Sequence, residues 1–175
     1  MKKAIPLLAA LCLLLSIAGC SLERSGWKAP VTFFYRRQSS ELQAHPEGGV
    51  IVPEEREISG RNNDLFYLLS LYLRGPLDDG LVSPFPAGCR LVGINRNGTT
   101  LHVILDEHFA ALKDMELTTA CACLARTCMA LAGVEQVHIE AAASDGKAAV
   151  NLILDERSLL LEDTVTAPSE TVPAE

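Results

Sequence analysis

The feature that most constrains the fold is an alternation of helical and strand patterns across residues 31–163. Apolar residues at helical spacing occur in two segments, and each segment is followed by two strand patterns joined by a turn. Hairpins form antiparallel sheets, and an amphipathic helix must bury its apolar side. The sequence therefore predicts an α+β fold, with an antiparallel or mixed sheet of hairpins and two helices on one face. The hydrophobic fraction of 49% is sufficient for such a core.

The first part of this region is expected to be extended. Residues 31–36 are β-branched and aromatic and predict a strand, and a polar loop is expected to follow as far as Gly49. Residues 50–58 predict an arm that Pro53 interrupts. Since proline cannot donate to a strand ladder, we place this arm at a sheet edge.

Two amphipathic helices are predicted. In the first, Asn62 or Asn63 serves as the cap and Gly75-Pro76 ends the helix. Its apolar stripe is Leu65, Leu68, Leu69, Tyr72 and Leu73. The second runs from about residue 116 to 131, and Gly133 closes it. Its apolar stripe is Leu117, Ala120, Cys121, Leu124, Cys128 and Leu131.

The remaining segments are loops and hairpins. The acidic, proline-rich loop 77–88 is a candidate functional surface, because long loops often carry binding residues. Residues 90–96 and 99–105 predict a hairpin around Asn97-Gly98, a pair typical of a type I′ turn. Residues 134–142 and 148–154 predict a second hairpin, and a short last strand is expected at 159–161.

The N-terminus has the layout of an export signal. Lys2 and Lys3 precede an apolar run of 14 residues, 4–17, which ends at Ile17-Ala18-Gly19-Cys20. The run is shorter than the ~20 residues that a membrane-spanning helix needs. The segment resembles a bacterial lipoprotein signal, in which the cysteine carries the fatty acyl chains, such as palmitate. The resemblance implies a signal peptide at 1–19, lipidation of Cys20 and a place on the extracytoplasmic face of the bacterial cell membrane.

The charge of the chain narrows the choice of partners. Removing Lys2 and Lys3 with the signal changes the formal net charge from −7 to −9. An acidic chain has no basic surplus to neutralise phosphates, so we expect no nucleic-acid partner. Attachment to the membrane is expected through the lipid on Cys20, with a tether at 20–30, a domain at 31–163 and a disordered acidic tail at 164–175.

Four cysteines lie within the domain: Cys89, Cys121, Cys123 and Cys128. We favour small apolar core residues for them, with a bridge from Cys89 to the second helix as the alternative. Their spacing does not suit zinc, and no histidine pair has the usual zinc spacing. No metal site and no cofactor are predicted.

Several short segments, in this order, resemble the GerMN domain of sporulation and spore-germination lipoproteins. They are Val-Thr-Phe-Phe-Tyr (31–35), Val-Pro-Glu-Glu-Arg-Glu-Ile (52–58), Leu-Arg-Gly-Pro (73–76), Pro-Ala-Gly (86–88) and Ala-Gly-Val-Glu-Gln-Val (132–137). The resemblance implies an exported module similar to ring-building modules. The best-known member has two such domains in tandem, whereas one is expected here. The family has no established catalytic residues, so the resemblance supplies none.

Three kinds of function are considered. The first is a membrane-tethered binding or assembly module of sporulation, germination or the cell envelope, which contacts itself or envelope proteins through the arm 50–58 and the loop 77–88. The second is a lipoprotein that binds a ligand or peptidoglycan. The third, ranked last, is a cell-wall enzyme. Its sole candidate cluster is Asp106-Glu107-His108, whose side chains we expect to point apart, with His108 as a surface or capping residue. His102 and His138 are expected at outward strand positions. We therefore predict a protein that is not an enzyme.

Overall fold

The computed structural model describes residues 30–44, 49–144 and 146–159. The helices and strands in chain order are β1 (Pro30–Arg37), α2 (Ser39–Ala44), β2 (Ile51–Glu57), α3 (Leu65–Tyr72), β3 (Leu81–Val82), β4 (Leu91–Asn97), β5 (Thr100–Leu105), α4 (Glu107–Ala110), α5 (Asp114–Ala132), β6 (Gln136–Ala142), β7 (Ala148–Asp155) and the 3₁₀ helix η1 (Arg157–Leu159). The predicted signal peptide, Cys20, the tether up to residue 29 and the tail lie outside the described residues.

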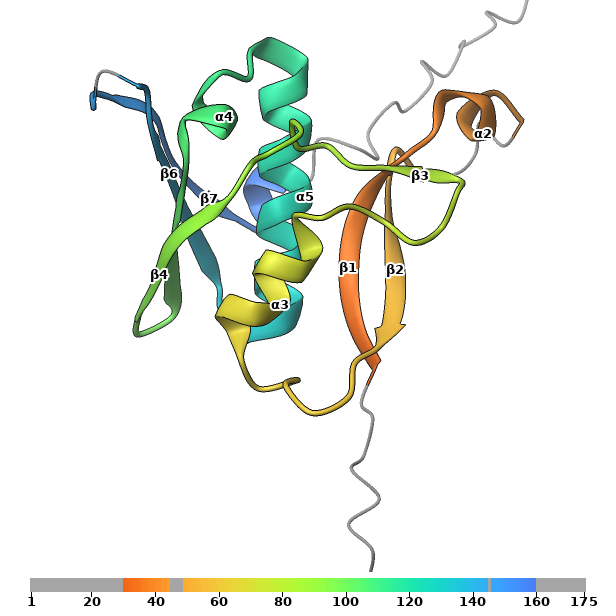
Figure 1. Cartoon of the computed structure of the whole chain (residues 1–175), viewed down its shortest axis with the longest axis horizontal. Helices are drawn as coiled ribbons and strands as arrows, with labels where there is room; N and C mark the ends of the chain where they lie inside the picture. The colour runs from red at the N-terminus through yellow and green to blue at the C-terminus, as the bar shows by residue number, and fades with distance from the viewer. Residues whose placement is uncertain (1–29, 45–48, 145, 160–175) are drawn as a thin grey trace, which may run out of the picture.

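The described strands form two sheets (Figure 1). The first has the order β2-β1-β3 and the second the order β4-β5-β6-β7. All neighbours are antiparallel except β5 and β6, which are parallel. A parallel pair needs a crossover connection, and α5 lies in the segment that supplies it. The predicted α+β class with an antiparallel or mixed sheet is confirmed.

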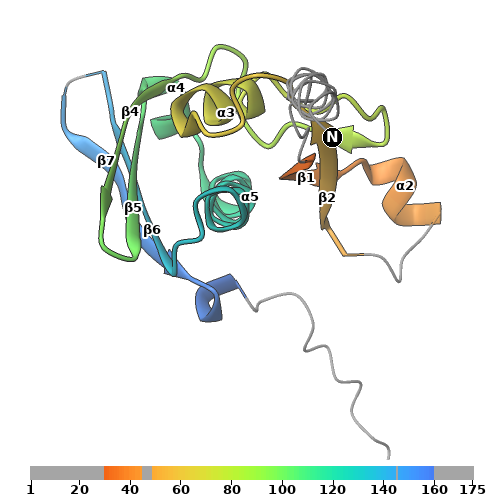
Figure 2. The ribbon, with the colours of Figure 1, turned by 90° about the horizontal axis from the view of Figure 1, so that it is seen from below.

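Helix α5 lies between the two sheets, with α3 beside it (Figure 2). It contacts β1 of the first sheet and β6 of the second. We expected both helices on one face of a single sheet. Residues of α5 outside its predicted stripe, such as Cys123 and Thr127, are also fully buried. The helix therefore has apolar surface on more than one side, and a sheet packs on each of two sides. Among the described helices, α5 alone is long and apolar enough to cross a membrane by length and composition.

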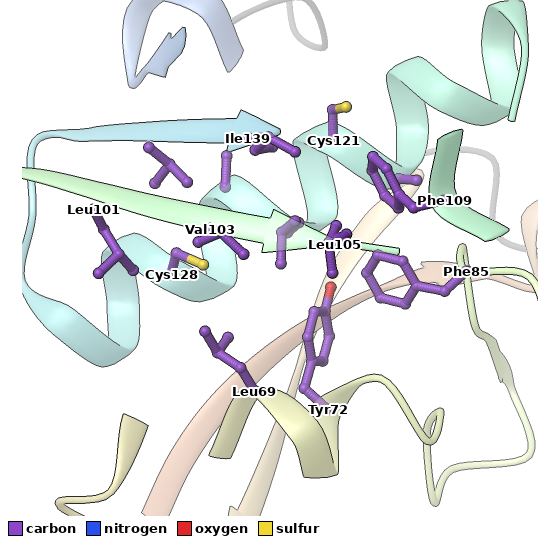
Figure 3. Close-up of a cluster of buried hydrophobic side chains, with 14 of the residues drawn as sticks. Leu69, Tyr72, Phe85, Leu101, Val103, Leu105, Phe109, Cys121, Cys128 and Ile139 are labelled. Atoms are coloured by element: carbon purple, nitrogen blue, oxygen red, sulfur yellow. The ribbon is translucent and has the colours of Figure 1, made fainter. Parts of the chain in front are cut away.

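The core joins α5 to the inner face of the second sheet and to the aromatic residues of the first (Figure 3). Leu101, Val103 and Leu105 of β5 alternate inward toward α5, as the strand pattern predicted. Phe33, Tyr35, Tyr72, Phe85 and Phe109 form a chain of rings with successive centroids 4.9 to 6.5 Å apart. Aromatic contacts of this kind add about 0.5–1.5 kcal/mol per pair to the burial of their area.

Strand β2 continues through Pro53, although we expected an interruption there. Phe34, the register partner of Pro53, turns its peptide groups away from β2: its N–H donates to Thr127 Oγ1 at 2.9 Å, and its carbonyl accepts from the Tyr72 hydroxyl at 2.6 Å. Pro53 thus occupies a pair in which the ladder requires no donor. The predicted edge position of the arm is confirmed, since β2 is the outer strand of its sheet.

The ends of several elements differ from the predictions. The expected loop before Gly49 contains α2. The N-cap of α3 is Asp64 instead of Asn62 or Asn63, and its carboxylate accepts from Tyr67 N at 2.9 Å. Asp64 can make this bond because its φ and ψ are extended, which is the backbone conformation of a cap. The predicted end at Gly133 is confirmed: its φ is 58° and its N–H bonds to Met129 O.

One turn prediction and one strand prediction also need correction. Asn97 pairs with Thr100 as the last residue of β4, so the loop residues of the first hairpin are Gly98 and Thr99. Gly98 has a φ of 61°, and glycine at the first central position is typical of a type II′ turn rather than type I′. The short last strand is wrong in its described part, because Leu159 lies in η1 and is buried against the core.

Candidate functional site

The arm and the loop that the sequence nominated as contact surfaces lie side by side and are bonded to each other. Glu54 of β2 accepts hydrogen bonds from Leu77 N at 2.7 Å and Asp78 N at 2.9 Å through the same carboxylate oxygen, Oε1. We call β2 together with residues 77–80 the arm–loop surface. The two parts were predicted separately, and no local sequence pattern indicates this hydrogen bond.

A buried ion pair fixes the junction from within. The Arg56 guanidinium contacts the second carboxylate oxygen of Glu54, with Nε 2.6 Å from Oε2. It also donates to Gly75 O at 2.7 Å and to the Tyr35 hydroxyl at 3.1 Å, and it lies over the Phe33 ring, 4.9 Å from the centroid. The side chains of Glu54 and Arg56 are 8% and 6% exposed. Each of their charges is therefore paired and hydrogen-bonded, which a buried charge requires.

The network anchors the segment that leaves α3. The Tyr35 hydroxyl donates toward Tyr72 O at 2.8 Å and Gly75 O at 3.1 Å, both carbonyls of that segment. Gly75 has a φ of 102°, a conformation that favours glycine, so the chain can turn sharply here toward Glu54. The start of the predicted loop is thus held in one conformation by buried groups.

Beyond this anchor the surface is exposed. Leu77 is 78% exposed, and Asp78 and Asp79 are exposed beside it. The loop is ordered further by Asp78, whose carboxylate accepts from Gly80 N at 2.8 Å, and by β3, which pairs with β1. An apolar side chain presented by a fixed acidic turn is suited to contact with another molecule.

The neighbouring strand edge is less suited to receiving another strand. The register turns the peptide groups of Pro53 and Glu55 to the outer side of β2, where Pro53 has no N–H to donate. Proline and charged residues on an edge strand hinder pairing with a further strand. Contact at the arm–loop surface is therefore expected through side chains.

The groups at this junction do not form an acid–base pair. Burial raises the pKa of the Tyr35 hydroxyl well above its usual range, although the Arg56 charge opposes the shift. Tyr35 consequently stays protonated and serves as a hydrogen-bond donor. The arrangement holds the fold in place and offers no activated nucleophile.

The Asp106-Glu107-His108 cluster is closer together than the sequence predicted. Asp106 Oδ2 lies 3.1 Å from His108 Nδ1, and one ligand atom from each of the three residues lies within 4.8 Å of the others. The expectation that the side chains point apart was wrong because Asp106 is the N-cap of α4, with an extended backbone, and its carboxylate lies beside His108 in the first turn of the helix. The surface position of His108 is confirmed, with 46% of its side chain exposed.

A second cluster lies on the outer face of the four-stranded sheet. His102 and His138 are register partners on β5 and β6, and their rings stack with centroids 4.3 Å apart. His102 Nε2 lies 2.9 Å from Glu140 Oε2, and His138 Nε2 lies 2.8 Å from Asn151 Oδ1. The sequence placed both histidines on outward positions but did not bring them together, because parallel pairing of β5 and β6 cannot be read from the chain.

A depression lies between the end of α3, the loop residues 83–90 and the start of β4. It has a volume of about 830 Å³, and its lining includes Ser70, Ser83, Arg74 and Arg90. Among the described residues, its lining contains neither a carboxylate nor an imidazole. The cluster of His102 and His138 is thus separate from this depression, whereas the His108 ring lies against Gly88, one of the lining residues.

The four cysteines of the domain are buried free thiols, in agreement with their predicted role in the core. Burial raises the pKa of Cys121 to about 12, and burial together with the nearby Asp106 charge raises the pKa of Cys89 to about 12. Thiolates are the nucleophilic and metal-binding form of cysteine, so these residues are poor candidates for either role.

Comparison with known proteins identifies the family. Residues 32–166 match the family model Germane, described as sporulation and spore germination. The chain belongs to the Germane family. The predicted resemblance to the GerMN domain is therefore confirmed, and the family links the chain to sporulation or germination. That family is not a known class of enzymes.

Among solved structures, the chain is similar to the tandem GerMN domains of the sporulation protein GerM from Bacillus subtilis. The identity is 14% and the TM-score 0.49, and the match covers 72% of this Germane chain and 45% of that chain. The match thus spans less than half the length of the tandem-domain protein. No curated protein matched the chain.

Proposed function

We propose that this Germane-family chain is a lipid-anchored extracytoplasmic module that acts by protein–protein contact in sporulation or spore germination. Acyl chains on Cys20 hold it to the cell membrane, and the arm–loop surface meets its partner, which is either a second copy or an envelope protein. The role assigned to the lipid rests on the lipoprotein-like sequence around Cys20. Two acyl chains give stable anchoring, whereas one chain gives marginal binding.

The observation that carries the contact role is the fixed presentation of Leu77. Buried Glu54 accepts hydrogen bonds from the backbone N–H groups on both sides of the Leu77 Cα atom, yet the Leu77 side chain is 78% exposed. An apolar residue that is already ordered loses little conformational entropy on binding. The acidic neighbours Asp78 and Asp79 favour a partner surface that carries basic residues.

Site-specific crosslinking tests the contact role. A photo-crosslinking amino acid replaces Leu77 in one strain and Met115 in a control strain, because Met115 is 75% exposed but lies at the start of α5. During sporulation and germination of the native host, we expect a discrete protein adduct from position 77 and none from position 115. Equal adducts at both positions, or capture of peptidoglycan alone, would contradict the proposal.

Replacement of the lipid site tests the anchor. We expect Cys20→Ala to abolish acylation, so that the chain no longer enters the detergent phase in phase partitioning. Cys12→Ala is the matched control and should partition like the wild type, since Cys12 lies within the predicted signal. Unchanged partitioning of the Cys20→Ala variant would contradict the lipid assignment.

A further inference from the structure

We propose that His102, His138 and Glu140 form a binding site for a divalent transition metal ion, with zinc as the expected ion. The site lies on the outer face of the four-stranded sheet and is separate from the arm–loop surface. This inference does not depend on the proposed contact function. It revises the expectation from sequence that the chain has no metal site.

The sheet supplies a rigid platform for the three side chains. Strands β5 and β6 are the two interior strands of the order β4-β5-β6-β7, so each is hydrogen-bonded on both sides. Within the described part of the chain, the helices lie on the opposite face (Figures 1 and 2). The three side chains are each partly exposed, so an ion can reach them from solvent.

The distances are close to those of a metal site. One donor atom from each residue lies within 4.8 Å of the other two. In a tetrahedral zinc site with bonds of 2.0–2.2 Å, ligand atoms are about 3.3 Å apart. The adjustment required is therefore about 1 Å per side chain, which rotation about side-chain torsions can supply.

The adjustment has a definite form. The two imidazole rings are nearly parallel, at 11°, so their ring-plane lone pairs do not converge on one point. One ring must turn about χ2, a torsion with broad minima. His138 is held in the stack by Asn151 of β7, whereas His102 is bonded to Glu140, itself a proposed ligand. We expect His102 to turn, since an ion can replace its hydrogen bond to Glu140.

The ligand types select the class of metal. Two imidazole nitrogens and one carboxylate oxygen suit zinc and its neighbours in the first transition row, whereas magnesium and calcium prefer oxygen ligands throughout. Three protein ligands leave a fourth position open for water or for a group of a bound molecule. The exposed side chains of Ile153 and Val92, each 61% exposed, lie on this sheet and add apolar surface for such a molecule.

The other three-residue cluster is a weaker candidate. Asp106, Glu107 and His108 come from one short segment at the start of α4, and Glu107 and His108 are exposed. The outer-face cluster draws instead on two strands whose positions the sheet fixes. His108 therefore provides a matched control histidine for the experiment.

The test uses the full chain in detergent, with Cys12 and Cys20 replaced by serine in every sample so that these thiols cannot bind metal. Zn²⁺ is titrated in competition with a chromophoric chelator, and Co²⁺ absorption reports the coordination geometry. We expect one ion per chain, and at least tenfold weaker binding in His102→Ala, His138→Ala and Glu140→Gln. His108→Ala should bind like the parent chain, and zinc should shift the imidazole NMR signals of His102 and His138.

Binding that is absent at micromolar zinc, or unchanged in His102→Ala and His138→Ala, would overturn the proposal. Loss of binding in His108→Ala alone would place the metal at the α4 cluster and would also overturn it. Glu140→Gln keeps the shape of the side chain. Thermal melts followed by circular dichroism show whether a variant that loses zinc binding is still folded. The outcome of the zinc titration does not affect the crosslinking expected at Leu77. The metal site and the contact function can therefore be rejected separately.

Discussion

At the scale of single residues, Glu54 and Arg56 connect the fold to its exposed surface. Charged residues are rarely buried unless they are paired, and here one carboxylate serves Arg56 with one oxygen and the loop backbone with the other. The pair therefore does more than neutralise charge. It ties β2 to the chain that leaves α3.

Removing one member of this pair should be strongly destabilising. We expect Arg56→Ala to lower the free energy of unfolding by about 3–5 kcal/mol, because Glu54 is left buried without its cation. Urea denaturation measures the change. Glu55→Ala, at the exposed neighbouring position, should change stability by less than about 0.5 kcal/mol. An Arg56→Ala loss as small as that of Glu55→Ala would show that the pair is not needed for folding.

At the scale of elements, the open side of β1 is closed by helices rather than by another strand. Beyond its short pairing with β3, β1 presents Phe34, whose N–H and carbonyl are taken by Thr127 of α5 and Tyr72 of α3. Side-chain hydroxyls thus satisfy backbone groups that would otherwise be buried without partners. The bond between Phe34 and Thr127 therefore fixes the position of β1 along α5.

A substitution in α5 tests this closure. We expect Thr127→Val to lower the free energy of unfolding by about 1–3 kcal/mol, because the Phe34 N–H loses its acceptor in a buried site. Thr119→Val in the same helix is the control, since its hydroxyl bonds to Met115 O within the helix and is exposed. Amide hydrogen exchange at Phe34 should accelerate in the first variant only. Equal stability of the two variants would contradict the role of Thr127.

At the scale of the whole molecule, α5 joins two sheets into one core. The reactivity of the buried cysteines shows whether that core is closed. Cys89, Cys121, Cys123 and Cys128 are all buried, and they occupy both the loop before β4 and α5. Access of a reagent to these thiols therefore requires the core to open.

Thiol reactivity tests this view. The folded pKa of Cys89 and Cys121 is raised to about 12, so at pH 8 these thiols are protonated as well as buried. With Cys12 and Cys20 replaced by serine, we expect a disulfide reagent at pH 8 to label the chain no faster than it unfolds. An added exposed thiol, Met115→Cys, should react at once. Rapid labelling of the native core cysteines would contradict a closed core.

Local patterns predicted much of this fold. Strand β1, the stripes of α3 and α5, the end of α5 at Gly133 and the edge position of β2 depend on side-chain periodicity and on backbone chemistry, which residues near in sequence determine. The cap of α3 was missed by one or two positions, because Asn62, Asn63 and Asp64 are all competent caps and the backbone conformation selects among them.

The sequence by itself determined the α+β class, the apolar faces, the acidic charge and the membership of the Germane family, because these depend on composition and on order along the chain. Only the tertiary structure decided that α5 separates two sheets, that Glu54 joins the arm to the loop, and that His102 meets His138. Each of these contacts joins segments distant in sequence. Strand pairing and register bring such residues together, and no local pattern encodes them.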